Sequence, residues 1–242
     1  MAPSGSPRLG TVLSVWAHPD DEAWLASGLM AHAVRDGGRV VCVTATRGEG
    51  GSFDEERWPT ETLGGIRELE LMACLRRLGV EEHEFLDLPD IDMTTPLPET
   101  HGPARIRQLM AEVQPDTVLT FGLEGMTGHE AHKSVSRWTT DAFHAAARPR
   151  ARLYHARHTT AWAKQFLARL DQLGVFLPGT PVLAEEAELD LVFALPDDLL
   201  DVKLAALNEH TSQLEAIRQV YSPTELRDGA AKETFDLVAV KQ

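Results

Sequence analysis

Short apolar runs alternate with segments of helical spacing along most of the chain, and this alternation constrains the fold more than any other feature. Strands are predicted at residues 11–17, 39–46, 83–88, 115–122, 151–158 and 189–195. Helices are predicted at residues 21–36, 62–78, 103–113 and 197–219, and residues 122–146 form a loop that enters a further helix. Strands joined through helices need crossover connections, which link parallel strands. The pattern therefore predicts an α/β fold, with a mostly parallel sheet and helices on both faces.

The organisation along the chain favours one domain. The 242 residues contain no repeat, low-complexity tract or clear linker, although a chain of this length could also form two small domains. Because 43% of the residues are apolar and 25% are charged, a packed core is expected. We predict a single domain over residues 1–242, in which residues 160–242 could form a smaller subregion.

The charge balance limits the partners. The chain has 23 Lys and Arg residues against 37 Asp and Glu residues, a net charge of −14. This argues against nucleic acid or an anionic membrane as the main partner, and a surface charge that keeps the protein soluble is the simplest interpretation. No apolar stretch reaches the roughly 18 residues of a membrane helix. The first residues lack the pattern of a signal peptide. We expect a cytoplasmic protein with a small-molecule substrate, and a homo-oligomer is compatible with the sequence.

The two cysteines and several of the histidines have simple interpretations. Neither cysteine belongs to a C-x-x-C pair, which argues against a disulfide framework or a thiolate metal site. Buried free thiols are expected for Cys42 and Cys74. Solvated or hydrogen-bonded imidazoles are expected for His144, His155, His158 and His210.

Four polar clusters follow the first four predicted strands. They are AHPDDE (17–22), TRGEGG (46–51), DLPD (87–90) and GHEAH (128–132). The carboxyl ends of parallel strands lie at one edge of the sheet, and ligands bind there. The first cluster stands where a dinucleotide-binding protein has G-x-G-x-x-G, and its carboxylates would repel phosphate. The second cluster lacks the Lys-Ser/Thr of a P-loop. Both nucleotide-binding interpretations are therefore rejected.

Two of these clusters contain candidate metal ligands. His18 and Asp21 are three residues apart where a strand turns into a helix, and His129 and His132 repeat this spacing after the fourth strand. Imidazole and carboxylate together suit Zn²⁺, although such a site also accepts Fe²⁺ or Co²⁺. A cation would also offset the repulsion among the clustered acids. The second pair is one residue too close for the H-E-x-x-H of zincins.

Each of these residues, taken alone, also has an ordinary structural role open to it. Asp20 or Asp21 could cap a helix, and a lone His132 would more often be solvated or hydrogen-bonded than a ligand. Two pairs with equal spacing at two strand ends favour the metal site over coincidence.

The first and fourth clusters together resemble the PIG-L/LmbE-like family of zinc-dependent N-deacetylases, which act on N-acetylglucosamine-type sugars and related amides. The similarity extends to residues 46–51, 66–80, 85–90 and 203–213, so it covers about residues 10–215. It implies a Rossmann-like fold and one Zn²⁺ per chain.

The resemblance also implies roles for individual residues. It places the metal on His18, Asp21 and His132 and the general base on Asp20. His129 matches the histidine that stabilises the tetrahedral oxyanion. Three further matches concern the substrate: Arg67 as a contact to a sugar hydroxyl, Asp90 as a sugar-binding acid, and Glu49 as an acid of the pocket.

The chain departs from the family pattern at two positions. Ala131 stands where many members have an aspartate, so the carboxylate that orients the neighbouring imidazole must come from elsewhere, or His129 is tuned differently. Thr127 stands where some members have a tyrosine, and a threonine is too short to reach the oxyanion from that backbone position. Neither change removes a metal ligand.

The residues support a hydrolytic mechanism. Three protein ligands leave a fourth zinc position for water, whose pKa zinc lowers to about 7. Asp20 can take the proton of this water and pass it to the leaving amine, while His129, if protonated, can stabilise the oxyanion. The products are acetate and a free amine.

Three functions are compatible with these residues. A deacetylase of an N-acetylated sugar or aminosugar conjugate is the first. An amidase acting on a larger thiol-conjugate or antibiotic-precursor amide is the second. A non-catalytic binding module stabilised by a metal is the third, and it would need neither Asp20 nor His129.

Overall fold

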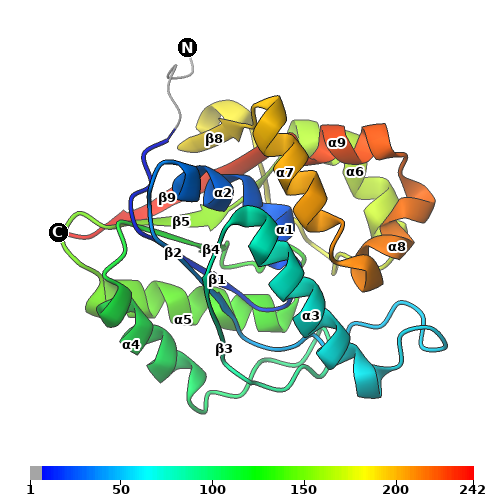
Figure 1. Cartoon of the computed structure of the whole chain (residues 1–242), viewed down its shortest axis with the longest axis horizontal. Helices are drawn as coiled ribbons and strands as arrows, with labels where there is room; N and C mark the ends of the chain where they lie inside the picture. Colours follow the sequence, from blue (N-terminus) through cyan, green and yellow to red (C-terminus); the bar gives the residue numbers. More distant parts are fainter. Residues whose placement is uncertain (1–6) are drawn as a thin grey trace.

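A seven-stranded sheet runs through the centre of the molecule (Figure 1). The computed structural model describes residues 7–242. The strand order is β3-β2-β1-β4-β5-β9-β8. The strands are β1 (Val12–Trp16), β2 (Val40–Thr44), β3 (Glu82–Phe85), β4 (Thr117–Phe121), β5 (Arg152–Ala156), β8 (Leu191–Ala194) and β9 (Lys232–Val240). The first five pair in parallel, whereas β9 is antiparallel to β5 and β8. The expected mostly parallel, Rossmann-like sheet is confirmed.

Helices cover both faces of this sheet, as predicted. Figure 1 shows α4 and α5 on one face, and α2, α3 and α7 on the other. The helices are α1 (Asp21–Leu25), α2 (Ser27–Arg35), α3 (Thr60–Leu78), α4 (Gly102–Val113), α5 (Glu130–Ala146), α6 (Thr160–Gln172), α7 (Asp197–Leu207), α8 (Thr211–Val220) and α9 (Pro223–Ala230). Among residues 7–242, no helix combines the length and the apolar composition that crossing a membrane requires.

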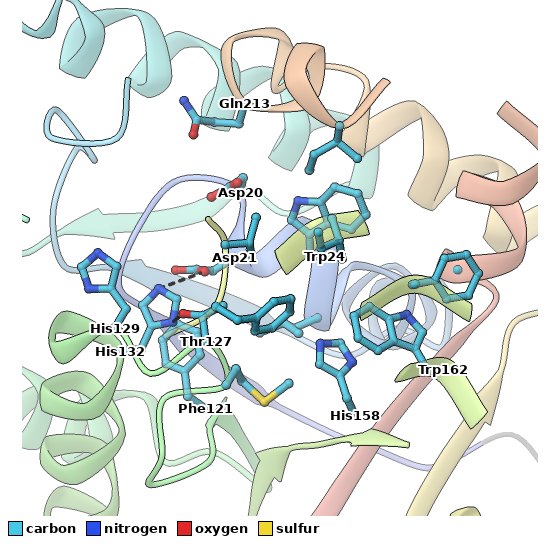
Figure 2. Close-up of a pocket in the computed structure, with 18 of the residues that line it drawn as sticks. Asp20, Asp21, Trp24, Phe121, Thr127, His129, His132, His158, Trp162 and Gln213 are labelled. Atoms are coloured by element: carbon cyan, nitrogen blue, oxygen red, sulfur yellow. Dashed lines mark hydrogen bonds and ion pairs between the residues drawn. The ribbon is translucent and has the colours of Figure 1, made fainter. Parts of the chain in front are cut away.

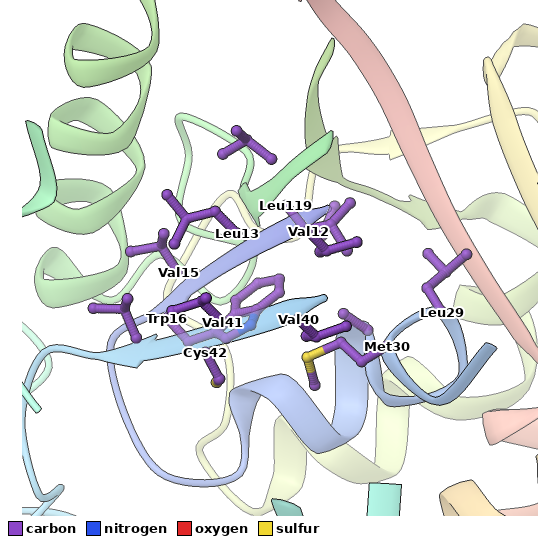
Figure 3. Packing of buried hydrophobic residues seen from close by; sticks show 14 of the residues in the cluster. Val12, Leu13, Val15, Trp16, Leu29, Met30, Val40, Val41, Cys42 and Leu119 are labelled. Carbon is purple, nitrogen blue, oxygen red and sulfur yellow. The ribbon is translucent and has the colours of Figure 1, made fainter. Parts of the chain in front are cut away.

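The main core lies between the sheet and its helices. β1, β2 and β4 are buried along their whole length because helices cover both of their faces. Figure 3 shows Val12, Trp16 and Val40 of these strands packed near Leu29 and Met30 of α2. Both Cys42 and Cys74 are buried free thiols, as expected.

The single helix expected over residues 21–36 is wrong in one respect, because the chain forms two helices there. The backbone leaves helical geometry at Ala26, which separates α1 from α2. The new helix is stabilised because its first amides, Gly28 and Leu29, donate to the buried carboxylate of Glu233 at 2.7 and 2.8 Å. Lys203 balances the charge of this carboxylate at 2.7 Å.

The long helix expected over residues 197–219 is also wrong. α7 ends at Leu207 and α8 begins at Thr211. The break places the His210 imidazole in the interior, where its Nε2 lies 2.8 Å from Oε1 of Glu22. Helical periodicity continues across the break, so the tertiary contact decides the backbone path.

The residues after 160 divide between two parts of the molecule. α7, β8 and β9 pack on or extend the main sheet. α6 and α8 instead form a second apolar cluster of Phe166, Leu214, Ile217 and Tyr221. A small parallel pair, β6 (His158–Thr159) and β7 (Leu183–Ala184), leads into this second part. A short 3₁₀ helix, η1, spans Glu186–Glu188.

The sheet order fixes where a ligand can bind. β1 and β4 are neighbours, although the connections that follow them run in opposite directions across the sheet. A crevice opens beyond the carboxyl ends of the strands at such a switch point. His18 follows β1, and His129 and His132 follow β4, so the two predicted pairs lie on either side of this crevice.

Candidate active site

A cavity of about 520 Å³ opens beyond the carboxyl ends of the strands. Residues from all four polar clusters contribute to its wall, namely His18, Asp20, Asp21, Gly50, Gly51, Asp90, His129 and His132. Figure 2 shows Asp20, Asp21, His129 and His132 together at one end of this space. The expectation that the clusters meet at one edge of the sheet is therefore confirmed.

Three side chains converge closely enough to hold a metal ion. The Nδ1 atom of His18 lies 3.0 Å from Nε2 of His132 and 3.6 Å from Oδ2 of Asp21. The other oxygen of Asp21 lies 3.5 Å from Nε2 of His132. The donor atoms of this group lie within 4.8 Å of one another, and all three residues are buried. Two imidazoles and a carboxylate form a donor set that fits a divalent transition metal.

Two acceptors outside the group orient its imidazoles. The Nδ1 atom of His132 lies 2.9 Å from the carbonyl oxygen of Gly125. Since a carbonyl only accepts, Nδ1 carries the proton and the Nε2 lone pair faces the group. In the same way Asp90 Oδ1 lies 3.2 Å from Nε2 of His18, which leaves the Nδ1 atom of His18 for the group. The Phe121 ring stacks on His132 at 4.2 Å between ring centroids and fixes its plane.

The electrostatics of the group call for positive charge. Burial lowers the pKa of His18, but the Asp21 and Asp90 carboxylates outweigh it and raise this pKa to about 9. Burial raises the pKa of Asp21, yet the two imidazoles bring it down to about 2. A cation among these acids is therefore stabilised, whether it is a proton on His18 or a metal ion.

Asp20 adopts an unusual backbone conformation beside this group. Its φ of 114° lies in the region that favours glycine, and such a conformation costs on the order of 1–3 kcal/mol. Its amide donates to Oε2 of Glu22 at 3.0 Å, and its Oδ1 accepts from Nη2 of Arg67 at 3.0 Å. Burial raises the pKa of Asp20 to about 6 in spite of the Arg67 charge. A carboxylate with such a pKa can accept a proton near neutral pH.

His129 caps the N-terminus of α5 and faces the same cavity. Its Nδ1 accepts from the amide of Ala131 at 3.2 Å, so in the neutral imidazole the proton is on Nε2. Burial, together with the charges of His18 and His132, lowers the pKa of His129 to about 3. The sequence-based hypothesis required a protonated His129, whereas this geometry lets the neutral ring donate through Nε2.

The three predicted substrate-binding residues lie at different distances from the cavity. Arg67 lines it, and its guanidinium also donates to the carbonyls of Gly48 and Pro19. Asp90 lines it too and contacts His18. Glu49 is not among the lining residues within 7–242, and its Oε1 accepts from the amide of Asp90 at 3.1 Å. It therefore lies behind Asp90.

The two departures from the family pattern both lie at the site. Thr127 lines the cavity, and its hydroxyl lies 3.4 Å from Nδ1 of His132. Ala131 is buried in the first turn of α5. The carboxylate that contacts an imidazole of the metal group comes from Asp90, in the loop that follows β3, and it contacts His18.

Sequence reasoning gave no role to several residues that line or support the site. Gln213, His158 and Trp162 line the cavity, while Glu22 and His210 form a buried pair behind Asp20. Gln213 and His210 lie in residues 203–213, whose resemblance to the family was the available signal. His158 and Trp162 carried no such signal, because they meet the site only through the fold.

Comparison with protein families gives a match over residues 13–143 to PIG-L, GlcNAc-PI de-N-acetylase. A relative from Mycobacteroides abscessus, named 1D-myo-inositol 2-acetamido-2-deoxy-alpha-D-glucopyranoside deacetylase, is 32% identical over 233 residues. The match covers 84% of this chain and 81% of the relative.

Two solved structures illustrate how the fold is used. N,N'-diacetylchitobiose deacetylase from Pyrococcus horikoshii has a TM-score of 0.64 at 20% identity, over 95% of this chain and 84% of its own. The 4-carboxy-2-hydroxymuconate hydratase from Pseudomonas putida has a TM-score of 0.63 at 19% identity, over 95% and 96%. At such identities the likeness shows the fold alone, and this fold supports two different reactions.

Proposed function

This chain belongs to the PIG-L family of GlcNAc-PI de-N-acetylases, and from this membership we propose that it removes the acetyl group from an N-acetylated sugar or aminosugar conjugate. The reaction is a metal-dependent hydrolysis that yields acetate and a free amine. Zinc as the ion and the cytoplasm as the location are part of this proposal.

One observation carries the proposal more than any other. His18, Asp21 and His132 converge from the ends of β1 and β4, and Asp20 lies beside them at the same cavity. A purely structural metal site has four protein ligands and is closed, whereas three ligands beside a cavity leave a position for a reactant. The adjacent base distinguishes a hydrolase from a binding module.

The residues divide the chemical work. We assign His18, Asp21 and His132 as the residues that hold the metal, which when bound polarises the amide carbonyl and makes water a better nucleophile. Asp20 takes a proton from the attacking water and returns it to the departing nitrogen, so that the amine leaves uncharged. His129 donates from Nε2 to the oxygen that becomes negative as the carbonyl carbon turns tetrahedral.

The same proposal assigns substrate contacts. Arg67 and Asp90 face the cavity beside Asp20 and His18, where they can bind sugar hydroxyls. Glu49 acts indirectly, because its carboxylate accepts from the amide of Asp90 and thereby holds that acid in place. The relative from Mycobacteroides abscessus is named for an N-acetylglucosaminyl-inositol substrate, which has many such hydroxyls.

Incubation with a panel of N-acetylated sugars tests the function, with the released amine as the readout. We expect release by the zinc-loaded protein, none after chelation, and recovery on addition of Zn²⁺. Full activity of the metal-free protein would contradict the metal-dependent mechanism. Stoichiometric zinc without release from any panel member would exclude the sugar deacetylase. It would favour the larger amide or the binding module.

A further inference from the structure

The cavity extends well beyond the predicted metal ligands into a region with a different lining. We call this region the aromatic arm and define it by Trp24, His158, Trp162, Phe166 and Tyr221. Figure 2 shows Trp24, His158 and Trp162 on the side of the cavity opposite His129 and His132. The arm is continuous with the metal group, because Trp24 lies one helical turn after Asp21 on α1.

The rings of the arm form a connected surface. His158 and Trp162 stack at 3.7 Å between centroids with an interplanar angle of 5°. Trp162 meets Phe166 at 5.8 Å, and Phe166 meets Tyr221 at 5.9 Å. Stacked and tilted pairs of this kind hold the side chains in place. The arm is therefore a largely preformed wall.

His158 contributes to the wall as an uncharged ring. Burial, with a smaller effect from Lys203, lowers the pKa of His158 to about 3. Its imidazole stacks face to face on the Trp162 ring. The arm thus presents flat, apolar surface.

Phe166 and Tyr221 belong to the second apolar cluster, but a structural role alone does not account for the tryptophans of the arm. Trp24 and Trp162 are only partly buried, and both line the open cavity instead of being enclosed in the core. Apolar surface that faces water is unfavourable, and large apolar patches on natural proteins mark binding sites. Pockets of about 300–1,000 Å³ accommodate ligands of drug size, and this cavity of about 520 Å³ falls within that range.

The two sides of the cavity differ in chemistry. Around Asp20 the wall is polar, with Arg67, Asp90 and Gln213, and it suits the hydroxyls of a sugar. Charged residues such as Arg157, Glu186 and Lys232 also line the cavity, but the five rings of the arm offer few groups that could replace the hydrogen bonds between those hydroxyls and water. A fully polar substrate would leave the arm unused.

We propose that the aromatic arm binds an alkyl or aryl group carried by the amide substrate, next to the bond that is hydrolysed. This inference rests on the proposed function and narrows its substrate to an amide with one polar and one apolar part. The apolar group can be attached in two ways, as a longer acyl chain or as a substituent on the amine side of the amide. In both cases the same rings receive it.

Two matched pairs of substrates test the inference and separate the two attachments. The first pair is methyl and octyl N-acetyl-β-glucosaminide, and the second is methyl N-acetyl- and methyl N-octanoyl-β-glucosaminide. In at least one pair we expect kcat/KM to be about 10-fold or more higher for the octyl or octanoyl compound, because each buried methylene adds to transition-state binding. Turnover of the methyl N-acetyl compound with no gain in either pair would overturn the inference and leave the proposed function intact.

Variants assign the preference to the arm. Trp162→Ala should bring the ratio of kcat/KM values in the preferred pair close to one, and Trp162→Phe should keep part of it. Phe85→Ala is the matched control, because Phe85 is a half-buried aromatic residue on β3 outside the lining of this cavity. It should show the wild-type ratio. An unchanged ratio in folded Trp162→Ala would overturn the inference.

A binding measurement with the amine products shows which proposal fails, the deacetylase function or the role of the aromatic arm. The amine products methyl and octyl β-glucosaminide contain no amide, so calorimetry measures their affinity regardless of activity. If the octyl glycoside is the preferred substrate, octyl glucosaminide should bind at least about 10-fold more tightly than methyl glucosaminide, with the difference lost in Trp162→Ala; if only the octanoyl amide is preferred, the two amines should bind equally. Tighter binding without hydrolysis of any substrate would overturn the proposed function and support the arm. Equal binding of both amines, together with no preference in turnover, would overturn the arm.

Discussion

Two buried clusters of similar composition lie side by side at the start of α1 and have very different surroundings. One consists of His18, Asp21 and His132, and the other, which we call the sealed cluster, consists of Glu22, Cys74 and His210. Asp21 and Glu22 are adjacent in the chain but point to opposite sides of it. The donor atoms of each cluster lie within 4.8 Å of one another, so proximity alone would make both of them metal sites.

The difference lies in where the hydrogen bonds go. In the sealed cluster Glu22 Oε1 accepts from Cys74 Sγ at 3.3 Å and lies 2.8 Å from Nε2 of His210. These members use one another as partners, and none of the three lines the cavity as residues 7–242 form it. In the first cluster Gly125 and Asp90 bind the outer nitrogens of the imidazoles, so that the inner ones face each other at 3.0 Å. Orientation from outside and access to the cavity therefore distinguish a site that can hold a metal from one that is merely polar.

The sealed cluster still serves the active site. The second oxygen of Glu22 accepts from the strained amide of Asp20 at 3.0 Å. His210 and Cys74 fix the carboxylate that makes this bond. The sealed cluster thus holds the backbone that aims Asp20 at the cavity, while the first cluster provides the metal ligands.

Removal of a ligand from the first cluster should have the largest effect. We expect His132→Ala and Asp21→Asn to lose bound zinc and turnover together, because two donors do not hold the ion tightly. Activity should fall to that of the chelated protein, and excess Zn²⁺ should partly restore it in Asp21→Asn. Metal analysis and kcat on the same preparations provide the test. A variant that keeps a full equivalent of zinc and full turnover would show that its residue is not a ligand.

Asp20→Asn should separate the residues that bind the metal from the residue that transfers the proton. The substitution keeps the shape of the side chain and all three ligands, so zinc content should stay at the wild-type level. Loss of the proton acceptor should lower kcat by about 10²–10⁴-fold. His129→Ala should behave in the same way, with retained metal and reduced kcat. If Asp20→Asn lost its zinc while Asp21→Asn kept both zinc and kcat, the two roles would be reversed.

His210→Ala should lower the stability of the fold and leave metal binding unchanged. It leaves the Glu22 carboxylate buried without its main partner, and loss of one member of a buried pair costs about 3 kcal/mol. We expect the free energy of unfolding to fall by about this amount, while zinc content stays at the wild-type level. His210→Gln keeps a donor and should recover part of the loss. Denaturant titration measures the effect, and an unchanged midpoint would show that the pair contributes nothing to stability.

The two clusters also show how far sequence reasoning extends. The site residues after β1 and β4 were predictable because each pair is local in the chain, and one rule for parallel sheets brings the strand ends together. For His210 the sequence predicts a solvated or hydrogen-bonded imidazole, and the hydrogen-bonded alternative is confirmed, but the sequence does not predict its partner. Its contact with Glu22 joins residues 188 positions apart, and no local pattern encodes such a contact.

The aromatic arm was unpredictable for the same reason. Trp24 comes from α1, Trp162 from α6 and Tyr221 from the end of α8, and these helices meet only in the folded chain. The prediction of the sheet succeeded in its parallel part, where apolar runs and helices alternate. It missed β9, which returns antiparallel to β5 at the end of the chain.

The sealed cluster should make stability depend on pH in a defined direction. Burial and the Arg67 charge lower the pKa of His210, whereas the Glu22 and Asp20 carboxylates raise it. The carboxylates have the larger effect, so the pKa of His210 in the folded protein is above the ordinary value of 6.5. Cys74, the remaining titratable member, stays protonated because burial raises the pKa of its thiol. A histidine whose pKa is higher in the folded than in the unfolded protein stabilises the fold when it is protonated. This contribution is complete at pH values below the pKa of the unfolded state and disappears as pH rises through the pKa of the folded state. The stability difference between wild type and His210→Gln should therefore be larger at pH 6 than at pH 9, as measured by denaturant titration. A difference that grows with pH would contradict this assignment.

The smallest expected effect belongs to Cys74→Ala, and it tests most directly whether the sealed cluster holds a metal. A metal there would need a thiolate, but burial and Glu22 raise the pKa of Cys74 well above its ordinary value, so the thiol stays protonated and donates to Glu22. Nε2 of His210 lies 2.8 Å from Oε1 of Glu22, so the two side chains already serve each other as hydrogen-bond partners.

We therefore expect one equivalent of zinc in both wild type and Cys74→Ala, with unfolding free energy lower by about 1 kcal/mol in the variant, from lost packing and a weak hydrogen bond. Ser14→Ala, a small change at another fully buried polar side chain, controls for general destabilisation. A second equivalent of zinc in wild type, absent from Cys74→Ala and retained in Ser14→Ala, would show that access to the cavity is not what separates the two clusters.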